Sequence, residues 1–381
     1  MEMEHYSEPR LTSYLFSKAS RNLIPLSGTF ELSPVCNFSC KMCYVRKTRQ
    51  EVESHTRPIV TKEQWLQIAR EAREEGMLYL LLTGGEPFLW PEFWELYEEL
   101  SHMGFLISIN TNGSLIDEAA VERLKKMPPV RINITLYGAS DASYEKLCGV
   151  ENVFKRVDHA ISLLQESGIA VKLNGSLTPY NIEELEACIQ YADRRNLVYE
   201  TNTYMFPPLR RDSSMVGQNE RFTPEEAAYY NAKCFLLQNG KDMYQKRMEA
   251  ILNRSILPPG LAESCVDPVD GKIRCRAGKA SFWITWDGYM TPCGMMPEPK
   301  ADVLKRPFKQ VWKELAEFSA GLKLSGVCAK CPNQGLCHCC AAMAMAETGT
   351  TSGIPSYLCE MVDEMRKQAE EYMASIDNDN K

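Results

Sequence analysis

The sequence predicts an α/β fold in which six strands form a parallel, partial (β/α)6 barrel that is followed by a cysteine-rich segment. From about residue 28 to 204, short apolar runs alternate with amphipathic stretches of helical periodicity. This is the pattern of βαβ units around a parallel sheet. Six units are too few for a closed eight-stranded barrel. Nine of the 15 cysteines then lie between Cys265 and Cys359, where long periodic elements are scarce.

The boundaries of the elements follow from the hydrophobic periodicity. Apolar runs predict strands at 28–33, 77–84, 105–110, 130–136, 169–175 and 197–204. Helical periodicity predicts helices at 61–75, 91–103, 117–126, 152–167 and 181–195, the first opened by Thr61 as a cap. Because parallel strands end at one edge of a sheet, functional residues are expected at the carboxyl ends of the strands.

Composition divides the chain into five parts. Residues 1–27 are predicted to be an N-terminal extension, and residues 28–206 the barrel. A Pro-rich, polar stretch at 207–222 opens a bridge that continues to residue 262, with helical segments at 223–239 and 241–253. Residues 263–360 form the cysteine-rich domain, which cannot bury much apolar surface alone and is expected to need metal. Residues 361–381 are predicted to be a closing helix and a frayed tail.

The charge balance and the N-terminal sequence exclude several classes of protein. The formal net charge of −7 gives no support for a nucleic acid or an anionic membrane as a partner. No apolar run is long enough for a transmembrane helix, and the acidic start lacks the features of a signal peptide. We therefore expect a cytoplasmic protein in a reducing compartment. Clustered cysteines there indicate metal or redox chemistry rather than disulfides.

The first cysteine cluster lies directly after the first predicted strand. Cys36, Cys40 and Cys43 are separated by three and then two residues, which suits three irons of one cubane cluster and leaves the fourth iron open. An open iron is what substrate-coordinating chemistry requires. The alternative is a zinc site that a distant histidine completes, although zinc ligands usually occur in CxxC pairs.

A second motif, Thr83-Gly84-Gly85-Glu86-Pro87, lies at the end of the second predicted strand. Together with the CxxxCxxC loop, it resembles the radical S-adenosylmethionine (SAM) superfamily over residues 28–204. The resemblance implies a 4Fe–4S cluster whose open iron chelates the amino and carboxylate groups of SAM. It also implies that the reduced cluster cleaves SAM to a 5′-deoxyadenosyl radical, which abstracts a hydrogen atom from the substrate.

The same resemblance implies a set of contacts to SAM. Gly84 and Gly85 would let the backbone approach the ligand closely, and Glu86 would accept hydrogen bonds from the SAM ammonium group. Further candidate SAM contacts are Met42, Tyr44, Pro87, Asn110, Asn112, Thr135, Lys146, Asn174, Leu177 and Thr178. A turn-forming role is an equal alternative for the Asn112-Gly pair. Cys148 stands where the family often has an arginine that contacts the SAM carboxylate, so Lys146 or Asn174 would replace it.

The second cysteine cluster resembles the SPASM extension of that superfamily, over about residues 265–360. The resemblance implies two auxiliary 4Fe–4S clusters, so that the chain would hold three in all. The nearer would use Cys265, Cys275, Cys293 and Cys340, and the outer Cys328, Cys331, Cys337 and Cys359. Cys339 is the alternative to Cys340, because the next family cysteine would fall at Ala341. Structural zinc remains an alternative, since CxxC pairs suit zinc as well. If Cys265 is not a ligand, the nearer cluster keeps an open iron.

The resemblance further implies an oxidoreductase that acts on a peptide or small protein. SPASM-type enzymes include maturases of ribosomally synthesised peptides, which form thioether or carbon–carbon crosslinks, and the segment 275–296 resembles that branch. The 35 residues before Cys36 are too few for a leader-binding module. We therefore expect a stand-alone leader-binding protein, recognition of the peptide core, or a small substrate. A flavodoxin- or ferredoxin-type protein would donate electrons.

Other functions and other polar residues stay open. The alternative functions are Ser or Cys dehydrogenation as in sulfatase maturases, radical chemistry on a small molecule and, remotely, a non-catalytic Fe–S or zinc interaction protein. Asp287, Tyr137 and Lys172 lie near expected strand ends or the cluster loop, but the sequence assigns none of them an acid–base role. The isolated cysteines are predicted to be buried structural thiols, namely Cys148, Cys188 and Cys234.

Overall fold

The computed structural model describes residues 10–254, 271–273 and 275–379, and its centre is one mixed sheet. The strand order is β6-β5-β4-β3-β2-β1-β7-β8-β9. The six predicted strands are β1 (Ser27–Glu31), β2 (Tyr79–Thr83), β3 (Leu106–Thr111), β4 (Arg131–Thr135), β5 (Val171–Ser176) and β6 (Tyr199–Asn202). They pair in parallel in chain order, which confirms the predicted partial barrel.

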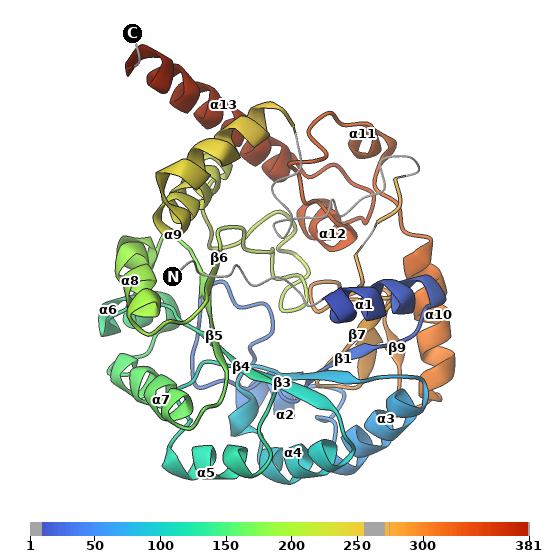
Figure 1. Ribbon diagram of the computed structural model, residues 1–381. Coiled ribbons are helices and arrows are strands. Elements are labelled where there is room, and N and C mark those ends of the chain that lie inside the picture. Colours follow the sequence, from blue (N-terminus) through green and yellow to red (C-terminus); the bar gives the residue numbers. More distant parts are fainter. Residues whose placement is uncertain (1–9, 255–270, 274, 380–381) are drawn as a thin grey trace.

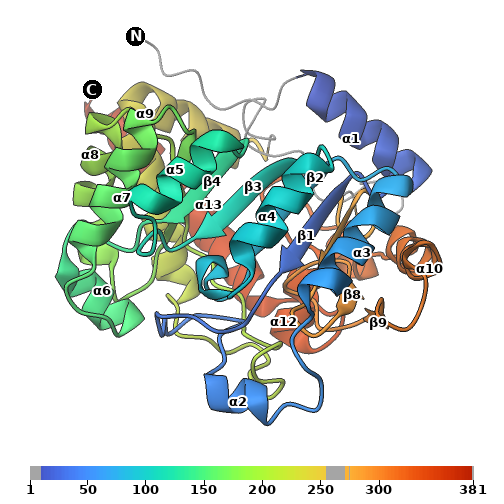
Figure 2. The same cartoon turned by 90° about the horizontal axis from the view of Figure 1, so that it is seen from below.

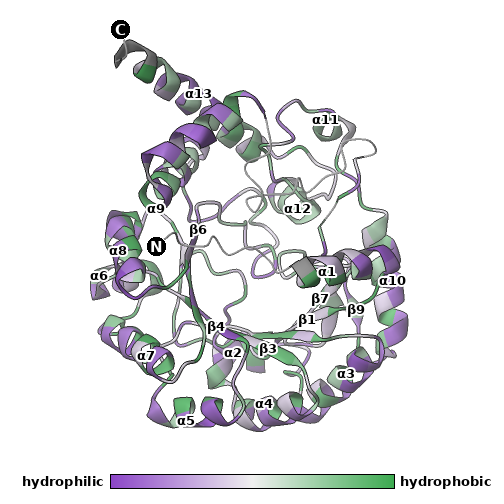
Figure 3. Cartoon of the chain, in the orientation of Figure 1, coloured by the Kyte–Doolittle hydropathy of each residue, from purple (hydrophilic) through white to green (hydrophobic). Residues whose placement is uncertain are grey.

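Amphipathic helices cover the outer face of this sheet, as Figures 1 and 2 show. They are α3 (Lys62–Glu74), α4 (Phe93–His102), α5 (Glu118–Lys126), α7 (Phe154–Glu166) and α8 (Leu185–Arg194). Thr61 and Asp117 cap α3 and α5 at the predicted starts. Polar and apolar residues share each helix (Figure 3), and the apolar side chains of α3 are the buried ones, namely Trp65, Ile68, Ala69 and Ala72. In the described part of the chain, no helix is long and apolar enough to cross a membrane.

The two faces of the barrel sheet differ in polarity, which places the site. Successive side chains of a strand point to opposite faces. Phe30, Leu82 and Ile109 point toward the helices and are fully buried. On the inner face, Thr135 of β4 lies beside Asn174 of β5, and both are partly exposed. The helices therefore seal the outside of the sheet, and the polar inner face is left for chemistry.

The cysteine-rich segment has few long elements, as expected, but it adds three short strands and one longer helix that the sequence did not predict. β7 (Ser281–Ile284) pairs in parallel with β1, and β8 (Tyr289–Thr291) and β9 (Ala301–Asp302) continue the sheet in antiparallel fashion. Helix α10 (Phe308–Ala320) packs behind them. These strands are too short to show periodicity, and they are stable because β1 offers them an edge.

Several elements outside the predicted set complete the barrel region. They are α1 (Arg10–Asn22), α2 (Arg49–Glu53), α6 (Asp141–Cys148) and the short 3-10 helix η1 (Pro87–Leu89). A second 3-10 helix, η2 (Ile182–Glu184), forms the first part of the helix predicted at 181–195. α6 follows β4, where no helix was predicted. η1 begins inside the Gly-Gly-Glu-Pro motif, where Pro87 takes the first helical position that suits proline.

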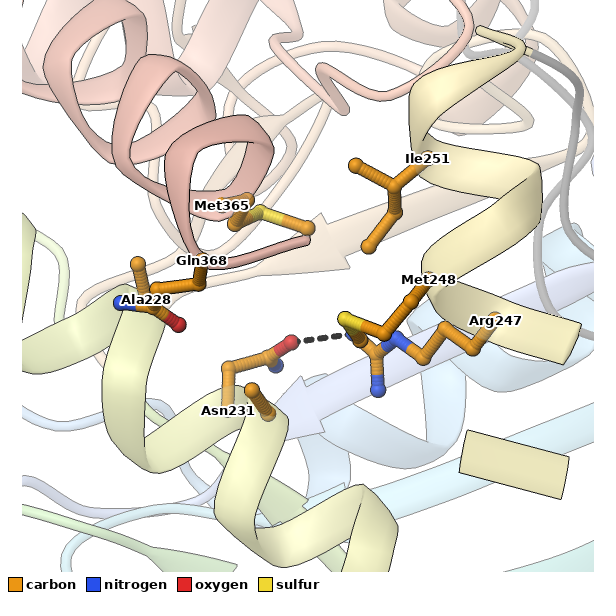
Figure 4. A pocket seen from close by; sticks show the side chains of 8 residues that line it. Ala228, Asn231, Arg247, Met248, Ile251, Met365 and Gln368 are labelled. Atoms are coloured by element: carbon orange, nitrogen blue, oxygen red, sulfur yellow. Dashed lines mark hydrogen bonds between the residues drawn. The ribbon is translucent and has the colours of Figure 1, made fainter. Parts of the chain in front are cut away.

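Two long helices pack against each other beside the barrel. α9 (Pro224–Leu252) is kinked at Gly240, which has φ 77° and separates the two predicted segments. α13 (Ser356–Asp379) packs along α9 and is longer than predicted, whereas α11 (Gly326–Ala329) and α12 (Ala341–Thr348) are short. Figure 4 shows the small pocket between α9 and α13, where Arg247 donates a hydrogen bond to Asn231. This mostly apolar pocket lies away from the strand ends, so it does not compete with them as a cofactor site.

Candidate functional site

The three-cysteine loop follows β1 at the carboxyl edge of the sheet. Two backbone amides donate to its thiols, Phe38 N to Cys36 Sγ at 3.3 Å and Arg46 N to Cys43 Sγ at 3.3 Å. The side-chain amide of Asn112 also reaches Cys36 Sγ at 3.8 Å. Hydrogen bonds of this kind orient thiolate ligands and raise the reduction potential of an iron–sulfur cluster.

The electrostatics of this loop suit a positively charged metal group. The pKa of Cys36 is raised to about 12, chiefly by burial and further by the nearby Glu86, Cys40 and Cys43 groups. Burial and Cys40 likewise raise the pKa of Cys43. The pKa of Cys40 is lowered, chiefly by a hydrogen bond with the Cys148 thiol. Three thiols that oppose one another's ionisation fit a cluster whose iron atoms supply the compensating charge.

Gly84 and Gly85 bring the end of β2 against the backbone that leads into the loop. A Cβ at Gly84 would stand 2.4 Å from the Ser33 carbonyl oxygen, and one at Gly85 would stand 2.5 Å from that of Val35. Gly85 N donates to Ser33 O at 2.7 Å, and Glu86 N donates to Val35 O at 3.0 Å. The close neighbour that requires glycine here is therefore the cysteine loop's own backbone.

Glu86 is fully buried, and both of its carboxylate oxygens already accept hydrogen bonds. Oε1 accepts from Thr111 Oγ1 at 2.8 Å and from Phe88 N at 3.2 Å, while Oε2 accepts from Asn112 N at 2.9 Å. Burial is the main cause that raises the pKa of Glu86 to about 7. Glu86 thus ties the ends of β2 and β3 together, and its contact with the SAM ammonium group stays a prediction.

Asn112 supports the loop from the end of β3. Its Oδ1 accepts from Ser114 N at 2.9 Å and from Ser114 Oγ at 2.7 Å, and its Nδ2 donates to Asn37 Oδ1 at 2.9 Å. Asn112 therefore forms the turn that was the alternative prediction for this residue, and it also donates a hydrogen bond to Asn37 of the cysteine loop. Asn110 accepts from Asn133 Nδ2 at 2.7 Å on the inner face of the barrel.

The remaining candidates for SAM contact differ in location, and only some of them lie on the inner face of the barrel. Thr135 and Asn174 lie side by side on the inner face, and Met42 is partly buried against the core. Lys146 is exposed and pairs with Glu183 at 3.0 Å, so the structure does not bring its ammonium group to the loop. Leu177 and Thr178, which directly follow β5, are both buried.

Cys148 contacts the loop from α6, where the family resemblance placed an arginine. Its carbonyl oxygen accepts from Ser39 N at 2.8 Å and from Ser39 Oγ at 3.1 Å, and its thiol lies beside Cys40. The side chain itself is fully buried. Cys188 and Cys234 are also buried, as predicted.

A buried ion pair between Arg210 and Glu31, which the sequence did not predict, joins the site to the cysteine-rich segment. Arg210 donates to Glu31 through two bonds of 2.6 and 2.8 Å and to Gly294 O at 3.0 Å. Trp283 Nε1 also donates to Glu31 at 2.9 Å. The Arg210 guanidinium carbon lies 5.8 Å from the centre of the Tyr44 ring, which places Tyr44 between the two cysteine regions. The only signal in the sequence was an arginine pair inside a stretch that otherwise reads as a linker.

The division of the later cysteines into two ligand groups stays a prediction, and the pKa shifts of their thiols show which of them influence one another. Burial raises the pKa of Cys340 to about 12, with a further rise caused by Cys275 and Cys293. The pKa of Cys337 is raised to about 11, chiefly by burial and further by Cys359, Cys328 and Cys331. Cys339 is buried and interacts chiefly with Cys337, which favours Cys340 for the nearer group. Cys265 lies outside the described residues.

The spacing of these thiols bears on the zinc alternative. Within the described ranges, no three His, Cys, Asp or Glu side chains lie close enough to hold one metal ion. Four thiolates around one zinc would stand about 3.8 Å apart, because each Zn–S bond is about 2.3 Å. The described side chains therefore form no ready site for a single zinc ion, and both zinc and auxiliary clusters stay predictions for this segment.

The comparison with known families concerns the barrel. Residues 30–192 match the model of the radical SAM superfamily. The chain carries a radical SAM domain. A domain of this family implies SAM and one 4Fe–4S cluster as cofactors, and the three-cysteine loop stays the predicted place for both.

Curated relatives match over most of their own length. The AdoMet-dependent heme synthase of Methanosarcina barkeri is 23% identical over 331 residues, which cover 84% of this chain and 92% of the relative. A probable GTP 3′,8-cyclase of Saccharolobus islandicus is 29% identical over 275 residues, which cover 72% of this chain and 84% of the relative. The names of these relatives differ in substrate.

Solved structures extend the likeness beyond the radical SAM domain. Streptococcus suis SuiB bound to its precursor peptide SuiA superposes with a TM-score of 0.63 at 17% identity, covering 94% of this chain and 84% of SuiB. Native anSMEcpe with bound AdoMet gives a TM-score of 0.64 at 18% identity, covering 94% of this chain and all of the other. At such low identity the likeness concerns the fold, and it includes the cysteine-rich segment.

Proposed function

We propose that this chain is a radical SAM maturase that crosslinks a ribosomally synthesised peptide through a thioether or carbon–carbon bond. The observation that carries the proposal is the likeness of the fold, cysteine-rich segment included, to that of SuiB, which was crystallised with its precursor peptide. Two auxiliary 4Fe–4S clusters on the later cysteines would serve electron transfer during peptide oxidation.

Different residues of the chain would hold the cluster, position the strand ends and face the substrate at the radical site. When bound, SAM and the reduced cluster supply a 5′-deoxyadenosyl radical. Cys36, Cys40 and Cys43 hold the cluster, and Glu86 and Asn112 keep the strand ends in register around it. The polar inner face of the barrel, with Thr135 and Asn174, is available to SAM and substrate.

Among the described residues, none of the three polar candidates stands out as an acid or base for the substrate. Asp287 accepts from Thr285 Oγ1 at 2.6 Å, Lys172 pairs with Glu200, and Tyr137 packs on Phe38 beside Cys40. Hydrogen abstraction by the adenosyl radical requires no protein base. A flavodoxin- or ferredoxin-type donor and a stand-alone leader-binding protein complete the proposed set of partners, which includes no nucleic acid and no membrane.

Two observations favour other substrates as the second candidate. The heme synthase relative covers 84% of this chain, which favours a small molecule. A structure of anSMEcpe holds AdoMet and a cysteine-containing peptide, which favours oxidation of a single Ser or Cys side chain.

The experiment begins with anaerobic reconstitution, which we expect to load about twelve irons per chain as three clusters. Dithionite and SAM should then give 5′-deoxyadenosine, and mass spectrometry should show that a peptide encoded near the gene loses two hydrogen atoms. Combined Cys36→Ala, Cys40→Ala and Cys43→Ala changes should abolish SAM cleavage and keep the auxiliary absorbance, whereas Cys188→Ala serves as a matched control. SAM cleavage by the triple variant would refute the mechanism, and turnover of a tetrapyrrole or nucleotide alone would refute the peptide assignment.

A further inference from the structure

The inner face of the barrel sheet carries a row of adjacent polar side chains. Asn110 of β3 lies beside Asn133 of β4, and Asn133 lies beside Lys172 of β5. On the outer face of the same strands, Ile132 and Leu173 are fully buried. The interior of a closed α/β barrel is usually packed with branched apolar side chains. A polar row in this place indicates an inner face that meets a polar group.

Asn110 and Asn133 form a pair of carboxamides with one hydrogen bond between them. Asn133 Nδ2 donates to Asn110 Oδ1 at 2.7 Å. Asn133 is 8% exposed, and among the described residues its buried Oδ1 has no hydrogen-bond donor. Asn110 is partly exposed, and within the described ranges its Nδ2 donates to no atom. The pair therefore leaves one acceptor and one donor unused on neighbouring strands.

These two unused atoms match the backbone of a peptide. A buried acceptor without a donor is costly, so Asn133 Oδ1 is expected to meet a donor when the inner face is occupied. In an extended peptide, the N–H and the C=O of one residue point to the same side, as they do in an antiparallel strand pair. Asn133 Oδ1 can accept from that N–H, and Asn110 Nδ2 can donate to that C=O.

The charges on the inner face favour an uncharged ligand at this pair. Lys172, beside Asn133, forms an ion pair with Glu200 of β6. Arg131, which precedes Asn133 by two residues on β4, is not without a partner either. A molecule rich in carboxylates or phosphates, such as a tetrapyrrole or a nucleotide, would need cations that are not already engaged. An amide group needs none.

The Asn pair lies farther from the carboxyl ends of the strands than the predicted SAM contacts do. Asn133 precedes Thr135 by two residues on β4, which corresponds to about 7 Å along the strand. Thr135 lies beside Asn174, and both are candidates for contact with SAM. Because SAM is predicted at the carboxyl ends, the Asn pair is placed to meet the substrate.

We propose that Asn110 and Asn133 bind the backbone of the peptide substrate on the inner face of the barrel. This assignment rests on the proposed function, in which the substrate is a peptide. It moves Asn110 from the predicted SAM contacts to the substrate contacts. Because backbone atoms are common to all peptides, the pair holds a peptide of any sequence, and other residues select among peptides.

The test compares two ligands that differ only in their backbone N–H groups. One is capped pentaalanine, and the other is its depsipeptide analogue, in which ester oxygens replace the N–H groups. Ligand-detected NMR titration of the anaerobically reconstituted protein with SAM bound would measure both Kd values. We expect the wild type to bind capped pentaalanine about fivefold more tightly than the depsipeptide, since one neutral hydrogen bond is lost.

Two variants separate the roles of the pair. Asn133→Leu should weaken pentaalanine binding about fivefold and change depsipeptide binding less than twofold, because only the N–H loses its acceptor. Asn110→Leu should weaken both ligands, because the carbonyl loses its donor. The SAM Kd should change less than twofold in both. Asn22→Leu, at an exposed asparagine of α1 that donates to Lys18 O at 2.8 Å, is the matched control.

Thermal unfolding without peptide distinguishes a binding role from a structural one. Asn133→Leu removes an unsatisfied buried acceptor, so the melting temperature should not fall by more than about 2 °C. A larger fall with unchanged pentaalanine affinity would show that the pair only supports the sheet.

The remaining outcomes are equally decisive. A wild type that binds no pentaalanine, or binds it no better than the depsipeptide, overturns the backbone contact. Weaker SAM binding in Asn133→Leu would return the pair to the SAM site. The proposed function fails separately, when the wild type cleaves no SAM or removes hydrogen from no peptide.

Discussion

At the residue scale, the site depends on atoms that the sequence motif does not show. The Gly-Gly pair is identifiable as a motif, but the structure shows that Ser33 and Val35 carbonyl oxygens occupy the space a Cβ would need. Glu86 was predicted to bind the ligand, and its carboxylate accepts from Thr111 and Asn112. Residue type and strand-end position were predictable. The partner of each side chain was not, because it depends on which strand ends become neighbours.

Gly85→Ala tests the close approach of the two backbone segments. The added Cβ would meet the Val35 carbonyl oxygen at 2.5 Å, so the loop must move away from β2. We expect a loss of about 1–3 kcal/mol in unfolding free energy and a large loss of SAM cleavage. Thermal unfolding and 5′-deoxyadenosine yield measure the two effects.

Gly326→Ala is the control for this substitution, because nothing lies within 4 Å of its added Cβ. It should leave both measurements unchanged. Wild-type stability and SAM cleavage in Gly85→Ala would show that the loop accommodates a methyl group, contrary to the geometry.

At the element scale, the barrel units were predictable and the edge strands were not. Helices such as α3 and α5 begin at the capping residues Thr61 and Asp117, so local chemistry set their limits. β7, β8 and β9 have four, three and two residues, and no periodicity can show in such lengths. They form because β1 has an unpaired edge, and that edge exists only after the barrel has folded.

A partly buried ion pair between Arg57 and Asp302 joins strand β9 to the segment after α2. Its contribution to the stability of the fold is expected to depend on pH. Arg57 donates to Asp302 at 2.6 and 3.2 Å, and these bonds are the main cause that lowers the pKa of Asp302 below its ordinary value of 3.8. Because the pKa of Asp302 is lower in the folded protein than in the unfolded chain, the unfolded chain takes up the proton at a higher pH. The stabilisation is therefore complete above about pH 4 and is lost at lower pH.

Asp302→Asn tests this pair with little change in shape. At pH 7 we expect a loss of about 2 kcal/mol in unfolding free energy, and the difference from wild type should shrink as the pH falls below the Asp302 pKa. Urea unfolding between pH 7 and pH 2.5 would measure it, with the exposed Asp193→Asn as control. A difference that stays constant over this range would contradict the electrostatic origin.

At the scale of the whole molecule, Arg210 and Glu31 join segments that are far apart in the sequence. Glu31 ends β1, Arg210 lies in the polar bridge, and Gly294 follows Cys293 of the later cysteines. Removing one partner of a buried ion pair leaves the other charge without compensation. The pair therefore couples the stability of the barrel to the position of the nearer cysteine group.

Arg210→Met should cost about 3–5 kcal/mol in unfolding free energy, because the fully buried Glu31 carboxylate would lose its cation. The double variant Glu31→Gln/Arg210→Met should recover part of this loss. Thermal unfolding of the two variants measures the coupling. Arg306→Met, which removes the partly exposed partner of Glu314, should cost less than about 1 kcal/mol. An Arg210→Met protein as stable as wild type would show that Glu31 carries no charge in the fold.

The sequence by itself determined the α/β partial barrel, the two cysteine regions and the motif residues at the first strand ends. These features follow from local signals, namely hydrophobic periodicity, caps and spacing along the chain. Only the tertiary structure decided that β7 extends the barrel sheet, that Glu86 accepts from Thr111 and Asn112, and that Arg210 pairs with Glu31. Such contacts join residues up to hundreds of positions apart, and no local pattern encodes which distant side chain becomes a neighbour once the chain is packed.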